Sequence, residues 1–338
     1  MSHSTMPCGS PQVSVGLPVF NGAAWLSNAL DSLLAQSFGD FELIISDNAS
    51  SDATQSICEQ YAAQDARIRY VRQTTNQGLV WNFNRVFELS SSPYFKWACY
   101  DDIYDPKFLE CCVEVLDRDP EVAWCHTRSR HINASGALLL GDETPEVSYL
   151  AETVPPMGIP GLPTRASIRP SDRFRAVILG SVGCLDSYGL IRSEIMRKTP
   201  LFLPYFGSEK VFMAELALWG RYHEVPQSLC FVRAHDKAAG SMRSRRQQRQ
   251  CINPTAKVWQ SDRLGLLCGY VAAVRRAKLP AKEKLHCYAA IGQYLLQFRK
   301  WKSVVRKALT GAGLAAEYPS LTGQSPGTTA ASMCESNQ

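Results

Sequence analysis

The sequence lacks several features that would each assign a class of protein. It has no run of about 18 or more uncharged apolar residues, which is the length that a membrane-spanning helix needs. Its first twelve residues are polar and do not resemble a secretory signal. It has no internal repeat and no Cys-x-x-Cys pair. We therefore expect neither a membrane span nor an exported protein.

The 12 cysteines are scattered and lack the spacing of zinc ligands or of a disulfide framework. Four of them, Cys58, Cys99, Cys125 and Cys268, lie in apolar stretches, where a free cysteine behaves as a small buried hydrophobe. Together with the missing export signal, this pattern predicts reduced thiols in a cytoplasmic protein.

The chain has 338 residues, of which 45% are apolar and 20% charged, with a net charge of +5. These values are ordinary for a soluble globular protein with a sizeable core. Two basic clusters stand out: Arg243, Arg245, Arg246 and Arg249, and Lys300, Lys302, Arg306 and Lys307 beside Trp301. Each could be a solvated helix face. The clusters lack the interleaved aromatics of a nucleic-acid site, so we expect no nucleic acid and favour an anionic membrane surface.

Residues 13–117 alternate between strand-like and helix-like patterns four times. We predict strands over 13–19, 41–46, 68–71 and 94–99, and helices over 23–36, 52–64, 78–89 and 106–117. This alternation is typical of a mostly parallel sheet that is covered by helices on both faces. Right-handed crossovers would bring the loops 18–22, 47–52, 76–78 and 101–105 together at one edge of the sheet.

Beyond Cys125 the pattern is looser. We predict a long loop over 140–168, a helix over 170–179, a strand over 183–191, a helix over 208–220, and extended segments over 224–225 and 229–233. Helical patterns dominate 243–309. The residues from 310 onward are rich in Gly, Ser, Thr and Ala, and their composition predicts disorder.

Two adjacent acids, Asp101 and Asp102, follow the apolar run 93–100 directly. Open α/β sheets bind ligands outside the carboxyl ends of their strands, and two carboxylates there suit a divalent cation that holds phosphate oxygens. The simpler interpretation is a helix cap and a solvated acid. The predicted meeting of four loops at this edge favours the binding site.

Three segments carry a resemblance to a known family: Val13-Ser-Val-Gly-Leu-Pro-Val-Phe-Asn-Gly22, Asp47-Asn-Ala-Ser-Ser-Asp52, and Tyr100-Asp-Asp-Ile-Tyr-Asp-Pro106. In this order and spacing they resemble the family 2 glycosyltransferases. The resemblance extends over residues 11–240 and implies the GT-A fold, a Rossmann-like, mixed and mostly parallel sheet flanked by helices. The implied organisation is a flexible 1–10, a donor half 11–125, an acceptor half 126–240, a helical C-terminal extension 241–309 and a disordered tail 310–338.

The resemblance also implies roles for individual residues. Asp102 would ligate Mn²⁺ or Mg²⁺, and Asp101 would contact the ribose or the sugar. His235 would make a second metal or phosphate contact, or would be a structural histidine. The donor-binding residues implied by the family are Pro18, Phe20, Asn21, Asp47, Asn48, Asn76, Asn82, Asp101 and Asp102. Phe20 could equally pack in the core, the two later asparagines could stabilise turns, and Asp52 is expected to cap a helix.

Glu209 is the candidate base that would deprotonate the acceptor hydroxyl, or else an acid favoured by the helix dipole; Glu215 is the second candidate. The resemblance thus implies a metal-dependent, inverting glycosyltransferase of bacterial polysaccharide biosynthesis. We expect it to act in the cytoplasm, or peripherally at the inner face of the membrane. Its donor would be a nucleotide-diphospho-sugar, preferably a UDP-sugar, and its acceptor a hydroxyl of a glycan, a lipid-linked oligosaccharide or a small molecule. The alternatives are a sugar nucleotidyltransferase, against which the first loop without Arg or Lys argues, and a non-catalytic relative that binds nucleotide-sugars.

Overall fold

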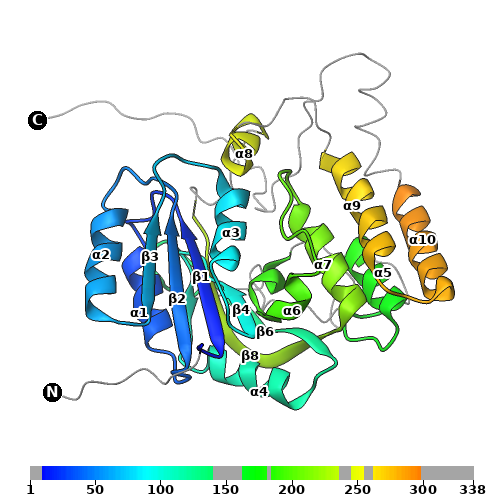
Figure 1. Cartoon of the computed structure of the whole chain (residues 1–338), viewed down its shortest axis with the longest axis horizontal. Helices are drawn as coiled ribbons and strands as arrows, with labels where there is room; N and C mark the ends of the chain where they lie inside the picture. Colours follow the sequence, from blue (N-terminus) through cyan, green and yellow to red (C-terminus); the bar gives the residue numbers. More distant parts are fainter. Residues whose placement is uncertain (1–9, 140–161, 181–183, 236–244, 255–261, 298–338) are drawn as a thin grey trace, which may run out of the picture.

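The computed structural model describes residues 10–139, 162–180, 184–235, 245–254 and 262–297. Within these residues the chain forms an eight-stranded sheet with helices on both faces (Figure 1). Most of the parallel pairing lies in the N-terminal half, and antiparallel pairs join the later strands. The predicted α/β fold class is therefore confirmed.

The N-terminal half alternates strands and helices as predicted. Its elements are β1 (Val13–Val19), α1 (Leu26–Leu34), β2 (Phe41–Asp47), α2 (Thr54–Gln64), β3 (Ile68–Arg72), α3 (Leu79–Glu88), β4 (Tyr94–Trp97), β5 (Ile103–Tyr104) and α4 (Phe108–Arg118). All seven residues of β1 are buried, because helices cover both faces of a parallel sheet. The strand expected over 94–99 ends at Trp97, which leaves the segment with the two acids outside the sheet.

The second half differs more from the sequence prediction. Its elements are β6 (Val122–Ile132), α5 (Pro170–Gly180), a 3₁₀ helix η1 (Leu185–Tyr188), β7 (Leu190–Arg192), α6 (Ser193–Met196), α7 (Ser208–Trp219), β8 (Arg221–Arg233), α8 (Arg245–Ile252), α9 (Asp262–Arg276) and α10 (Ala281–Leu295). The strand predicted over 183–191 is largely wrong, since η1 precedes a three-residue strand. The two extended segments predicted before Arg233 are one continuous strand. Most of the predicted loop 140–168 and all of the tail from 310 lie outside the described residues.

The strands lie in the order β3-β2-β1-β4-β7-β6-β8-β5. The strands β3, β2, β1 and β4 are parallel to one another. β7 is antiparallel to both β4 and β6, and β8 is parallel to β6. The two residues of β5 pair with β8, Ile103 with Phe231 and Tyr104 with Cys230. This short antiparallel pair brings the segment that follows β4 next to the end of β8.

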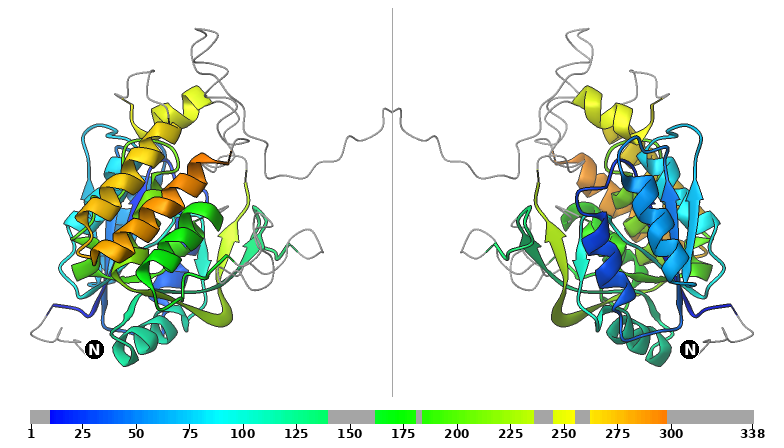
Figure 2. Two further views of the ribbon diagram at one scale, coloured as in Figure 1. Left: turned by 90° about the vertical axis from the view of Figure 1, so that its right-hand side faces the viewer. Right: turned by 90° about the vertical axis from the view of Figure 1, so that its left-hand side faces the viewer.

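Two apolar cores lie on opposite sides of the sheet. One packs α1, α2 and α4 against the sheet, and the other packs α3, α5, α7, α9 and α10. The two side views in Figure 2 show these layers, with α5, α9 and α10 on one side and α1 and α2 on the other. Because α9 and α10 share their core with α5 and α7, the C-terminal helices are part of the helical layer. The domain boundary at 240 stays a prediction, since residues 236–244 are not described.

Ten cysteines lie in the described residues and all ten are free thiols. Cys58 and Cys125 are buried, as expected, and Cys99 is half-buried. The expectation for Cys268 is wrong, because this residue is exposed. The buried face of α9 comprises Leu266, Gly269, Tyr270, Ala273 and Val274. In the part of the chain that is described, none of the helices combines the length and apolarity that crossing a bilayer requires.

The close contact between β1 and α3 yields a prediction about stability. A Cβ added at Gly16 would lie 2.6 Å from Cζ of Phe95 and 2.7 Å from a Cγ of Val86. Gly16→Ala should therefore lower the free energy of unfolding by about 1–3 kcal/mol, the usual cost of overpacking a core. Gly39→Ala is the control, because a Cβ there meets nothing within 4 Å. Equal urea midpoints for the two variants would contradict this packing.

Candidate active site

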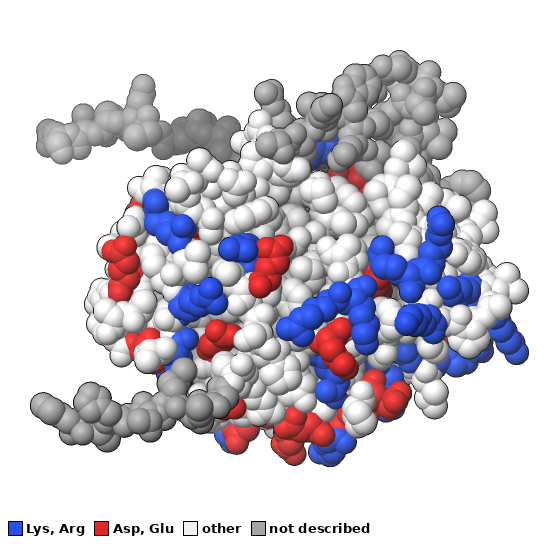
Figure 3. Space-filling view, in the orientation of Figure 1, with Lys and Arg blue, Asp and Glu red and all other residues white. Residues whose placement is uncertain are grey.

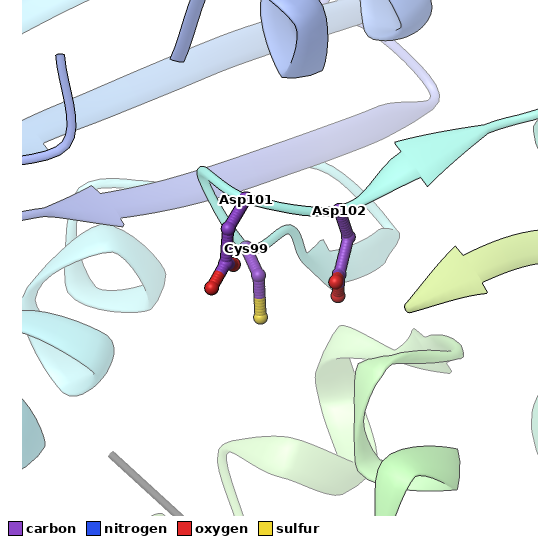
Figure 4. A group of neighbouring side chains, drawn as sticks. All are labelled: Cys99, Asp101 and Asp102. Carbon is purple, nitrogen blue, oxygen red and sulfur yellow. The ribbon is translucent and has the colours of Figure 1, made fainter. Parts of the chain in front are cut away.

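The two acids lie in the segment between β4 and β5. Figure 4 shows the side chains of Cys99, Asp101 and Asp102 pointing the same way from this segment. One ligand atom from each, the thiol sulfur and a carboxylate oxygen of either acid, lies within 4.8 Å of the others. β4 ends just before this segment, so the cluster lies at the carboxyl end of a central strand. The sequence predicted the two acids there but not the thiol.

Asp102 is 5% exposed. Burial and the negative charge of Asp101 raise the pKa of Asp102 to about 7, against the partial opposition of a hydrogen bond from the backbone of Arg233 and of the charge on Lys96. The backbone N–H of Arg233 donates to Oδ1 of Asp102 over 3.0 Å. Two carboxylates this close repel each other when both are ionised. A cation between them would remove that repulsion, so the pair fits a divalent metal.

His235 lies against Asp101. Its Nε2 is 2.8 Å from Oδ2 of Asp101, and its side chain is 2% exposed. The ring of Trp25 lies against it, tilted by 37° with 4.1 Å between centroids. Among the described residues, Nδ1 of His235 is buried without a hydrogen-bond partner. The structure thus places His235 at the acid pair, where it contacts Asp101. The contact of His235 with a metal ion or a phosphate stays a prediction.

Arg233 ties the acid segment to the turn after β6. Its Nε donates to the carbonyl of Asp101 over 2.7 Å, and one terminal nitrogen donates to the carbonyls of Asn133 and Ala134 over 3.1 and 2.9 Å. Trp25 donates to the same Ala134 carbonyl over 3.1 Å. Arg233 is 5% exposed, so this buried guanidinium fixes the position of the acids relative to β8.

The loops after β1 and β2 are joined by hydrogen bonds. Oδ1 of Asn21 accepts from the backbone of Ser51 over 2.8 Å, and the backbone of Asn21 donates to Ser50 over 2.8 Å. Asn21 has φ of 52°, a left-handed conformation that asparagine tolerates. A Cβ at Gly22 would lie 2.7 Å from the ring of Tyr100, so this loop also contacts the acid segment. The predicted meeting of these loops is thus observed.

The predicted donor-binding residues in the second and third loops are largely bonded to one another. Oδ1 of Asp47 accepts from Ser50, and its Oδ2 lies 3.0 Å from the Tyr70 hydroxyl and 3.2 Å from Nε of Arg72. Asn48 bonds Asn76 over 3.0 Å and the carbonyl of Gly78 over 3.1 Å. Both of these side-chain clusters hold the loops in place.

Asn82 and Pro18 are buried, and Phe20 is 42% exposed. The amide of Asn82 donates to the carbonyl of Ser46 over 2.8 Å and accepts from the Ser46 hydroxyl over 2.6 Å. Asn82 therefore supports the ends of β1 and β2, and its contact with the donor stays a prediction. Phe20 is not a core residue, so its ring can meet a ligand at this edge.

Glu209 lies in the first turn of α7. It is half-buried, and burial raises the pKa of its carboxyl group. The pKa of Tyr188 is raised by burial first, and to a smaller extent by the charges of groups that include Glu209, Asp102 and Asp101. Glu209 and the acid pair therefore all contribute to the electrostatic environment of one tyrosine. Glu215, the second candidate, is fully buried and bonds Arg276 through both carboxylate oxygens at 2.8 and 2.9 Å.

Sequence patterns did not single out Lys96, although it lies on β4. It is fully buried, donates to the carbonyl of Tyr188 over 2.6 Å, and lies 4.1 Å from the ring centroid of Tyr104 and 4.3 Å from that of Phe108. Burial lowers the pKa of its amine. The only signal in the sequence was a lysine inside an otherwise apolar run, which is rare unless its charge is compensated.

Residues 14–154 match the family model described as "Glycosyl transferase family 2". The match includes the three motifs in the loops after β1 and β2 and between β4 and β5. The resemblance to family 2 glycosyltransferases is therefore confirmed over these residues.

Curated relatives are similar over this same region. The chain is 29% identical over 129 residues to a chondroitin synthase of Escherichia coli, covering 38% of this chain and 19% of the relative. It is 34% identical over 109 residues to a putative glycosyltransferase, EpsE, of Bacillus subtilis, covering 32% of this chain and 39% of the relative. The matches thus span about a fifth to two fifths of these relatives.

Solved structures are similar over more of the chain. Residues 1–349 of TarS from S. aureus superpose with a TM-score of 0.60 at 14% identity, covering 88% of this chain and 75% of that one. The mannosyltransferase PcManGT of Pyrobaculum calidifontis superposes with a TM-score of 0.53 at 17% identity, covering 93% and 78%. At these identities the likeness shows the fold, which is the GT-A fold expected from the sequence.

The contacts of Arg233 predict how strongly the site depends on it. Arg233→Met should lower the free energy of unfolding by about 2–4 kcal/mol, because each buried carbonyl left without a donor costs about 1–3 kcal/mol. Arg221→Met on the same strand should cost less, since Arg221 pairs with Asp119 at a half-exposed position. Chemical unfolding of both variants measures the difference, and equal losses would show that the three carbonyls find other donors.

Proposed function

We propose that this protein transfers a sugar from a nucleotide-diphosphate donor to a hydroxyl group, with a divalent metal and with inversion at the anomeric carbon. The observation that carries the proposal is the acid pair at the end of β4, where Asp102 is buried beside Asp101 and its pKa is raised to about 7. The family match supports glycosyl transfer, and solved relatives in complex with UDP, UDP-GlcNAc, or GDP-Man and Mn²⁺ support a nucleotide-sugar donor.

We propose Asp102 as the principal ligand of Mn²⁺ or Mg²⁺, with Asp101 close enough to contribute an oxygen or to bind the donor's ribose or sugar. His235 would then orient Asp101, or reach a phosphate if its ring turns. Carboxylate oxygens suit either ion. When bound, the metal would stabilise the charge that develops on the departing nucleoside diphosphate.

The donor's nucleoside would lie over the loops after β1, β2 and β3. Phe20 offers an exposed ring face on which a base can stack, beside Pro18 and Asn21. Asp47 would hydrogen-bond the base, preferably uracil of a UDP-sugar. Its side chain is fully buried under Arg72, so Arg72 must move for this contact to form. Asn48, Asn76 and Asn82 would then hold the shape of the pocket floor.

Glu209 is the proposed general base. Its carboxylate would take the proton of the acceptor hydroxyl as that oxygen bonds the anomeric carbon. The bond between the anomeric carbon and the diphosphate oxygen breaks in the same step, and its electron pair leaves with the nucleoside diphosphate. One displacement of this kind inverts the anomeric centre. Glu215 is less suited, because both of its oxygens bond Arg276.

The acceptor is proposed to be a glycan, a lipid-linked oligosaccharide or a small molecule in bacterial-type polysaccharide synthesis. The protein would work in the cytoplasm or peripherally at the inner face of the membrane. Two other functions are weighed against this one. A sugar nucleotidyltransferase would need a basic residue in the first loop, and Pro18 to Gly22 contains none. A relative that only binds nucleotide-sugars would not need an acid such as Glu209 with a raised pKa.

Two conservative substitutions test the site. Asp102→Asn and Glu209→Gln should each lower turnover by at least about a hundredfold, the usual contribution of a metal-site charge or a general base. Donor consumption with and without Mn²⁺ measures this. Glu215→Gln is the matched control on α7 and should reduce stability more than turnover. Wild-type turnover in both of the first two variants would remove the assignment.

The raised pKa of Glu209 predicts an opposite effect on stability. The pKa of Glu209 in the folded protein lies above its ordinary value of 4.5, so the native state binds a proton more tightly than the unfolded chain does. Ionised Glu209 therefore destabilises the protein at neutral pH, and this penalty vanishes as the pH falls below the unfolded value. Glu209→Gln should melt at a higher temperature than the wild type at pH 7, and at the same temperature near pH 4. A lower melting temperature at pH 7 would contradict the burial of this charge.

A further inference from the structure

The outer face of α10 is apolar although no other described element covers it. Its inner face packs in the core through Cys287, Ala290, Ile291 and Tyr294. On the outer side, Leu285 is 67% exposed, Tyr288 40%, Leu295 43% and Leu296 66%. An exposed apolar patch of this kind is typical of a surface that contacts a partner or a membrane. This outer face of α10, defined by Leu285, Tyr288, Leu295 and Leu296, is called the α10 face below.

The α10 face runs almost the full length of the helix. Positions 285, 288, 292, 295 and 296 follow the i, i+3 and i+4 spacing of one helical side. Gly292 lies among them and has nothing within 4 Å of its Cβ position, so no residue in the described part of the chain covers the middle of the stripe. Figures 1 and 2 show α10 as an outermost helix of its layer, beside α9 and α5.

Basic residues border one end of the α10 face. Arg275, Lys278 and Lys282 are exposed around the turn from α9 to α10. Glu283, the acidic residue of α10, accepts hydrogen bonds from the Arg169 guanidinium and from the backbone N–H of Ser171. Figure 3 shows lysines and arginines gathered on the side of the molecule that carries α9 and α10. The surroundings of the face are therefore cationic.

We propose that the α10 face docks on an anionic lipid surface. An interfacial helix places its apolar side chains among the acyl chains and its cations among the headgroups, and the α10 face offers both in that arrangement. A second copy of this chain fits less well. A two-fold contact through α10 would either bring the cations of the two α9–α10 turns close together or leave them without an anionic partner in the interface. The inference rests on the proposed function in one respect: a lipid-linked acceptor would lie at such a membrane surface.

The test measures vesicle binding with the full chain. Wild-type protein should sediment with phosphatidylcholine vesicles that contain phosphatidylglycerol, and not with phosphatidylcholine alone. Leu285→Glu/Leu296→Glu should lower the partition coefficient by at least about tenfold, because two large apolar contacts are lost. Lys278→Glu/Lys282→Glu should lower it by about fivefold or more per residue, the contribution of one cation near an anionic surface. All four positions are at the surface, so circular dichroism should show native folding.

Matched controls lie on other faces of the molecule. Trp81→Glu changes an exposed apolar residue of α3, and Arg118→Glu reverses an exposed cation of α4; both should bind vesicles as the wild type does. Equal binding by Leu285→Glu/Leu296→Glu and wild type would overturn the proposal. The proposal would also be overturned if sedimentation equilibrium showed a wild-type dimer and a monomeric Leu285→Glu/Leu296→Glu variant. That result would assign the α10 face to a second copy of the chain.

Vesicle binding needs neither donor nor metal, so it separates this proposal from the proposed function. Asp102→Asn should lose transfer and keep wild-type binding to anionic vesicles. Leu285→Glu/Leu296→Glu should keep wild-type consumption of a nucleotide-sugar in the absence of vesicles. If the wild type binds vesicles but consumes no donor, the docking proposal stands and the proposed function fails.

Discussion

The site depends on the bonds that Arg233 makes across the sheet. Its backbone N–H holds Asp102, and its guanidinium holds the carbonyls of Asp101, Asn133 and Ala134. Asp101 and Arg233 are 132 residues apart in the chain. The acids therefore take their positions only when β8 has joined the sheet. The geometry of the site therefore depends on the whole sheet. Local unfolding at the end of β8 would release Asp101 and Asp102 from these positions.

The surroundings of Asp102 disfavour its ionised form. Burial and Asp101 both oppose the ionised form of Asp102, and only the backbone of Arg233, the thiol of Cys99 and the distant charge of Lys96 favour it. Lys96 is itself buried, and its amine contacts the carbonyls of Trp97 and Tyr188 and the rings of Tyr104 and Phe108. A buried ammonium and a buried carboxylate that do not bond each other contribute little stability. This arrangement is the one expected where a bound cation supplies the missing charge.

The sequence predicted the local features and missed the long-range ones, for a physical reason. The strands β1 to β4, the helices between them and the acid pair follow from apolar runs of four to seven residues and from the residues at their ends. The pairing of β5 with β8, the ring contact between Trp25 and His235 and the bond between Glu215 and Arg276 join residues 61 to 210 positions apart. Periodicity within one element carries no information about such partners. The strand predicted where η1 lies is wrong for the same reason. The buried residues of η1 are the polar Asp186 and Ser187, and Asp186 pairs with Arg165, which lies outside the element.

The α10 face and Glu209 are mechanically connected through α9. Arg276 at the end of α9 bonds Glu215 on α7, and a Cβ at Gly269 of α9 would lie 2.6 Å from Val211, two residues beyond Glu209. The interior of this layer is packed from α10 through α9 to α7, and close-packed interiors transmit displacement rather than absorb it. A surface that fixes α10 would therefore also fix the orientation of α7.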